Sequence, residues 1–139
     1  MIEFVYNTLA LIGFEHPLHP IATHVPMGMI IGGFIFRLAS FKWKDLEKTA
    51  HYCFTMALIF APVTVLLGIM DWQHRLFGKM SGLIIAKLIL GGIVMLLLAL
   101  ELYLYRKGNN GNSTMIPLYA LIFGVAIGLG FIGGQIVFG

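Results

Sequence analysis

Four apolar stretches, each close to 20 residues or longer, constrain what this chain can fold into. They run roughly over residues 21–41, 46–72, 82–105 and 116–138. A helix needs about 20 mostly apolar residues to cross the hydrocarbon core of a bilayer. The sequence therefore predicts an all-α membrane protein in which residues 1–139 form one domain, a bundle of four transmembrane helices.

The composition supports this fold class and excludes others. Hydrophobic residues make up 59% of the chain and charged residues only 11%, whereas a soluble domain carries roughly 25% charged residues. The nine Lys and Arg residues are scattered over several membrane boundaries, so the lipid bilayer rather than a nucleic acid is the expected partner. The single cysteine, Cys53, excludes a disulfide framework, a cysteine-ligated zinc or iron–sulfur site and the attachment motif of c-type haem.

The segment before the first span is expected to lie on the membrane rather than across it. Residues 4–14 are apolar but too short to span a bilayer. They follow Glu3 instead of the basic segment that opens a signal peptide. The sequence therefore predicts a short interfacial helix at the N-terminus.

The distribution of basic residues predicts how the bundle is oriented, because the side richer in Lys and Arg faces the cytoplasm. The larger group lies at one boundary and comprises Arg37, Lys42, Lys44, Lys48, Arg106 and Lys107. The smaller group lies at the other boundary and comprises Arg75, Lys79 and Lys87. Both termini are therefore expected outside the cytoplasm.

Polar residues converge on the predicted outer boundary. Four of the five histidines lie there, three around the start of the first span and one after the second: His16, His19, His24 and His74. Asp71, Lys87 and Gln135 are expected in the same layer. Ionisable groups at this depth are costly and are functional candidates, and histidine is both a metal ligand and titratable near neutral pH. His51 lies at the opposite boundary, with Glu101 as its expected partner.

Proline and glycine positions suggest how this layer is built. Pro26 suits the first turn of a helix, which would place His24 close to the helix start and point it towards the bundle. Gly28 and Gly32 lie four residues apart, a spacing that lets membrane helices pack closely. Together with Gly68 they are expected to leave room for a planar cofactor.

The first hypothesis for the outer layer is a b-type haem held by two histidines from different helices. His24 with His74 is the favoured pair of axial ligands, and His19 is the substitute for either. Basic side chains on the same side, Lys79 among them, are expected to neutralise the haem propionates. The residues assigned to the haem are three histidines, two cations and a glycine: His19, His24, His74, Arg75, Lys87 and Gly28.

Other hypotheses stay open beside the haem. A zinc, copper or iron ion could be bound directly by His16, His19, His24, His74 and Asp71. A quinone pocket or proton relay would use Asp71 and a histidine to handle protons. A structural subunit without a cofactor is the alternative from a different class. No Ser–His–Asp order, phosphate-binding glycine loop or H-E-x-x-H run predicts hydrolytic or nucleotide chemistry.

Three motifs carry a resemblance to a known family. They are HPLHPIATHVPMG near the start, GIMDW at the end of the second span and GGQIVFG at the C-terminus. Together they resemble a widespread family of bacterial four-span membrane proteins that is catalogued only as a domain of unknown function. The positions that match the family's motifs are His16, His19, His24, Asp71, Gly133 and Gly134.

The resemblance implies a place in respiratory electron transfer, because members of this family occur fused to Rieske-type or c-type cytochrome domains. The expected function is membrane electron transfer through one b-type haem near the outer face of the bacterial inner membrane. Such a chain would be a subunit of a larger redox complex rather than a stand-alone enzyme. Its expected partners are other redox subunits or a periplasmic cytochrome, and a quinone is a possible second cofactor.

Overall fold

The computed structural model describes residues 2–109 and 113–138, and that part of the chain is helical with no strand. The elements are α1 (Ile2–Leu11), α2 (Leu18–Ala39), α3 (Leu46–Arg75), α4 (Gly82–Arg106), the short 3-10 helix η1 (Ser113–Met115) and α5 (Ile116–Phe138). Four of these helices are long and apolar enough to cross a membrane. The predicted all-α bundle with a short N-terminal helix is therefore confirmed.

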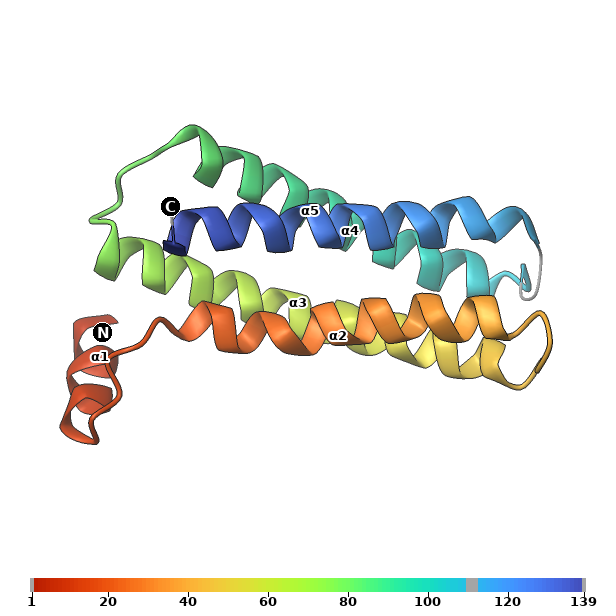
Figure 1. The fold of residues 1–139 in the computed structure, drawn as a ribbon, viewed down its shortest axis with the longest axis horizontal. Helices are drawn as coiled ribbons and strands as arrows, with labels where there is room; N and C mark the ends of the chain where they lie inside the picture. The colour runs from red at the N-terminus through yellow and green to blue at the C-terminus, as the bar shows by residue number, and fades with distance from the viewer. Residues whose placement is uncertain (1, 110–112, 139) are drawn as a thin grey trace.

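The four long helices run antiparallel in two pairs (Figure 1). The α2–α3 pair forms one layer and the α4–α5 pair lies against it. The helix α1 lies beside the end of the bundle where α2 begins and α3 ends, called here the α1 end, and contacts α3. The opposite end, where α2 and α4 finish, is called the far end.

Aromatic and aliphatic side chains fill the space between the layers. Phe54, Leu98 and Ile122 are almost completely buried, and the ring of Phe54 stacks on that of Tyr119 with 5.1 Å between centroids. Large apolar side chains also cover the outside of the bundle, with Leu96 72% exposed. This outward apolar surface is what contact with lipid chains requires.

The helix α2 begins at Leu18, three residues earlier than the apolar pattern predicts. Pro26 is therefore the ninth residue of the helix and is buried, so its predicted place in the first turn is wrong. The buried face of α2 runs through Pro26, Ile30, Gly33 and Arg37. Residues two apart on a helix point to nearly opposite sides.

His24 lies two residues before Pro26, and it is exposed. The prediction that its side chain points into the bundle is therefore wrong. Gly28 shares this outward face, is exposed, and has no atom within 4 Å of the position that a Cβ would take. Both residues face away from the bundle core, towards lipid or a neighbouring chain.

Close contact of α2 and α3 depends on Gly33, and this generates a first prediction. A Cβ built there would lie 3.1 Å from the ring of Phe54 and 3.2 Å from the Cβ of Cys53. Gly33→Leu should push the two helices apart and lower the free energy of unfolding by about 1–3 kcal/mol, the usual cost of overpacking. The measurement is the thermal unfolding midpoint in mild detergent.

The matched control is the neighbouring glycine. A Cβ at Gly32 would meet only the ring of Phe36, at 4.0 Å. Gly32→Leu should therefore leave the unfolding midpoint close to that of the unmodified protein. Equal losses for the two variants would contradict the packing described for Gly33.

Candidate functional site

Asp71 joins three elements at the α1 end. This residue lies near the end of α3 and is only 9% exposed. Its carboxylate accepts hydrogen bonds from the backbone N–H of Leu18 at 3.1 Å and of His19 at 2.7 Å, and also from the hydroxyl of Tyr6. The first N–H groups of a helix have no partner within that helix and favour a nearby negative charge. Asp71 therefore caps α2 from another helix and explains why α2 begins at Leu18.

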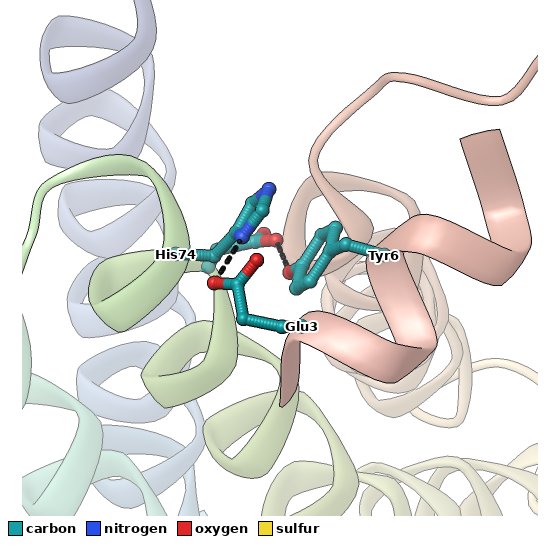
Figure 2. Close-up of polar contacts among 4 residues, drawn as sticks. Glu3, Tyr6 and His74 are labelled. Atoms are coloured by element: carbon teal, nitrogen blue, oxygen red, sulfur yellow. Dashed lines mark hydrogen bonds and ion pairs between the residues drawn. The ribbon is translucent and has the colours of Figure 1, made fainter. Parts of the chain in front are cut away.

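The helix α1 is attached to α3 by stacking and hydrogen bonds (Figure 2). The Tyr6 ring stacks on the His74 ring with 3.9 Å between centroids and an interplanar angle of 3°. His74 Nδ1 lies 3.0 Å from an Oε atom of Glu3. Burial raises the pKa of the Tyr6 phenol, and the hydrogen bond to the Asp71 carboxylate raises that pKa further. Neutral Tyr6 is therefore strongly favoured in the folded protein.

The imidazole of His19 is held in one tautomer. Its Nδ1 lies 2.8 Å from the backbone carbonyl oxygen of Thr64. A carbonyl oxygen can only accept a hydrogen bond, so in the neutral ring Nδ1 carries the proton and Nε2 keeps a lone pair. This Nε2 atom is buried and has no hydrogen-bond partner in the described part of the chain. A histidine fixed in this way is arranged as a metal ligand commonly is.

The His19 ring lies directly over Gly68 of α3. A Cβ at Gly68 would be only 2.9 Å from His19 Nδ1. Because Gly68 has no side chain, the imidazole ring of His19 can pack directly against α3 at this position. The prediction that Gly68 leaves room for a macrocycle is wrong, because His19 fills that space.

Lys87 completes the cluster from α4. It lies within electrostatic range of both His19 and Asp71, and its Nζ is 3.4 Å from the position of a Cβ on Gly133 of α5. No hydrogen bond or ion pair of Lys87 is found among residues 2–109 and 113–138. We call His19, Asp71, Lys87, Gly68 and Gly133 the His19 site.

The structure does not bring His24 and His74 together. Thr64 lies level with the start of α2, since its hydroxyl is 3.5 Å from the Ala22 carbonyl oxygen and its own carbonyl bonds His19. His74 is ten residues further along α3 than Thr64, which is on the order of 15 Å along the bundle. The two side chains cannot reach one iron in this arrangement.

The remaining predicted residues lie around the edge of this end. His16 is exposed and its ring meets Phe14 edge-on. Arg75 donates to the backbone carbonyl of Glu15. An open groove of ≈ 390 Å³ lies beside α5 and is lined by apolar residues together with Arg75, Lys79, Ser81 and Gln135. Within the described residues, no three side chains of His, Cys, Asp or Glu are arranged to hold a metal ion.

Sequence reasoning missed two members of this region. Tyr6 lies in an apolar segment that gave no sign of a contact with Asp71. The Thr64 carbonyl is a backbone group. Every residue has one, so the sequence does not indicate which carbonyl will accept a hydrogen bond from His19. The expected pairing at the other boundary is confirmed, because His51 Nδ1 lies 3.0 Å from Glu101 Oε1.

The raised pKa of Tyr6 predicts how the attachment of α1 depends on pH. The folded state favours the neutral phenol. The hydrogen bond from Tyr6 to Asp71 therefore makes its full contribution to the free energy of unfolding below the ordinary tyrosine pKa of about 10. That contribution is lost as the pH rises through the higher pKa of the folded state. In a titration of tyrosinate absorbance, Tyr6→Phe should show one late-ionising phenol fewer than the unmodified protein.

Tyr103→Phe is the control, since Tyr103 is 53% exposed and lies near the far end. This variant should leave the number of late-ionising phenols unchanged. An unchanged number of late-ionising phenols in Tyr6→Phe would contradict the assignment to Tyr6.

Comparison with known proteins places the chain in a family. No curated protein and no solved structure matches it at a significant level. A family profile described as "Predicted membrane protein (DUF2231)" matches residues 15–139. The match covers all four long helices and the whole His19 site, and it begins after α1. The chain therefore belongs to the DUF2231 family of predicted membrane proteins.

Proposed function

We propose that this protein is a membrane electron-transfer subunit that binds a b-type haem through His19. The single observation that carries the proposal is the state of the His19 ring. Its Nδ1–H is held by the Thr64 carbonyl at 2.8 Å, and its Nε2 lone pair is buried without a partner. An axial haem ligand needs both features, because the hydrogen bond orients the ring and strengthens Nε2 as a donor.

The number of available donors favours haem over a bare metal ion. A porphyrin supplies four nitrogen atoms to its iron, so one protein ligand is enough to hold it. A zinc or copper ion needs three or four protein ligands. Within the described residues, no group of three His, Cys, Asp or Glu side chains offers such a set. His19 alone therefore fits a haem better than it fits a bare ion.

Lys87 and the α5 glycines offer a place for a flat group. A Cβ at Gly133 would lie 3.4 Å from Lys87 Nζ, and one at Gly130 would lie 3.0 Å from Met27 Cε. The atoms that cover these glycines are the ends of flexible side chains, which can move aside. Lys87 would then supply a positive charge for a propionate.

The chain's own residues have distinct tasks in this function. His19 donates the Nε2 lone pair, and the Thr64 carbonyl and Gly68 set the plane of the ring. Asp71 holds the first turn of α2, and with it the position of His19. When bound, the haem supplies one-electron chemistry. The proposed setting is the outer side of a bacterial inner membrane, with both termini outside and a redox subunit or periplasmic cytochrome as partner.

The same tautomer bears on the quinone hypothesis. A quinone carbonyl needs a hydrogen-bond donor, which His19 Nε2 cannot be while Nδ1 donates to Thr64. A quinol hydroxyl could donate to this Nε2, with Lys87 nearby. A quinol site is therefore the second candidate, and a subunit without a cofactor is the third.

The test is the reduced-minus-oxidised absorption spectrum of the protein purified in mild detergent after expression with ample haem. We expect sharp α and Soret bands at about one haem per chain. His19→Ala should abolish these bands. His24→Ala should preserve them, because His24 is exposed on the outward face of α2.

Two outcomes would contradict the proposal. A featureless spectrum of the unmodified protein would exclude the cytochrome, and quinol binding would then be measured directly. Bands that survive His19→Ala but are lost in His24→Ala would show that another histidine holds the haem.

A second variant tests the role of the Thr64 contact. Gly68→Ala would place a methyl group 2.9 Å from His19 Nδ1 and push the ring off its acceptor. A weaker Nδ1–H bond makes the histidine a poorer donor to iron, so the midpoint potential of the haem should rise. Gly28→Ala is the control, because no atom lies within 4 Å of its Cβ position. Equal potentials in the two variants would refute the positioning role of this contact.

A further inference from the structure

A second buried polar pair lies near the far end of the bundle. Glu101 of α4 is completely buried, and its Oε1 atom lies 3.0 Å from His51 Nδ1 on α3. Its other oxygen, Oε2, is buried without a hydrogen-bond partner in the described part of the chain. Neither residue belongs to the His19 site, and the proposed electron transfer does not use them.

His51 lies between Glu101 and the surface of the bundle. Its ring stacks on Tyr105 with 3.5 Å between centroids and an interplanar angle of 2°. The His51 side chain remains 11% exposed, whereas that of Glu101 has no exposed surface. His51 is therefore the member of the pair that reaches the surface of the bundle.

The core closes the pair off from the α1 end. Leu98 precedes Glu101 by one turn on α4, and Phe54 follows His51 by one turn on α3. Both side chains are almost completely buried and apolar. A proton that reaches Glu101 from the far end therefore meets hydrocarbon beyond it.

The titratable and charged groups around the pair come from all four long helices. Tyr105 and Arg106 of α4, Tyr119 of α5 and Tyr52 of α3 lie around the pair itself. Arg37 of α2 and Glu47 and Lys48 of α3 act on the two tyrosines Tyr105 and Tyr119. Arg37 donates a 2.6 Å hydrogen bond to Ser40 and lies over the Tyr119 ring. Among the described residues, the hydrogen-bond partner of the Glu101 carboxyl group is His51 alone.

We propose that His51 and Glu101 form a proton-binding site that exchanges with water at the far end only. A carboxylate in this completely buried position, hydrogen-bonded only to a neutral ring within the described residues, carries a high desolvation cost. One bound proton makes the pair neutral. The pair then binds and releases a proton from one side only. It is not a proton channel across the membrane, because the buried apolar side chains of Leu98 and Phe54 lie beyond Glu101.

The transfer is balanced without a further reactant. A hydronium ion protonates His51 Nε2 and becomes water. The Nδ1–H bond breaks as an O–H bond forms at Glu101 Oε1. The pair then holds a carboxylic acid beside a neutral imidazole that is protonated at Nε2. Release follows the same steps in reverse.

Infrared spectroscopy of the whole protein in mild detergent tests this site directly. We expect the carbonyl stretching band of a protonated carboxylic acid at neutral pH, and that band should shift in deuterated water. Glu101→Gln should remove the band. Glu47→Gln, which changes another acid of the same end, should leave it in place.

His51→Phe separates exchange with water from protonation itself and keeps an aromatic ring to stack on Tyr105. Glu101 should remain protonated in this variant, and the deuterium shift of its band should become at least tenfold slower. The proposal is overturned if no band that depends on Glu101 appears between pH 5 and 9. It is also overturned if exchange with deuterated water is as fast in His51→Phe as in the unmodified protein. If Glu101→Gln does not fold, the exchange rate in His51→Phe still decides the question.

The result is separate from that of the proposed haem. The band should persist in His19→Ala, because the two sites lie at opposite ends of the bundle. Loss of the carboxylic acid band in that variant would contradict an independent proton site.

Discussion

One carboxylate holds the α1 end together. Asp71 accepts hydrogen bonds from Tyr6 and from the first two N–H groups of α2, and it is buried. In a membrane a backbone N–H without a partner is expensive, so this cap sets where α2 can begin. The start of α2 in turn sets where His19 lies against α3. The geometry of the whole His19 site therefore depends on one acidic side chain.

The spans could be predicted from sequence because their signal is strong and local. A run of apolar residues long enough for a bilayer identifies a helix without knowledge of its neighbours. The start of α2 could not be predicted in this way. The backbone N–H of Leu18 is capped by Asp71, which lies more than 50 positions later in the sequence. Because α2 begins three residues earlier than predicted, Pro26 is not in the first turn. His24 therefore faces the outside of the bundle, and not the interior as predicted.

The candidate site was predictable as a layer but not as a set of contacts. The polar residues near His19 were expected at one boundary, and Asp71 and Lys87 do lie there with it. Residue spacing does not reveal that His19 bonds a backbone carbonyl or that a glycine admits its ring. The His51–Glu101 pair was predictable because both residues are rare ionisable groups at the same depth.

The attachment of α1 also bears on how the protein sits in its bilayer. With 30 residues, α3 is about 45 Å long, well above the roughly 30 Å of a hydrocarbon core. Its last two turns, which include Asp71 and His74, extend to where α1 lies at the end of the bundle. If α1 lies at the lipid headgroups, as its short apolar sequence predicts, its bonds to this part of α3 would fix the depth of the α1 end in the bilayer. Bilayer thickness would then decide how far below the headgroups His19 is held.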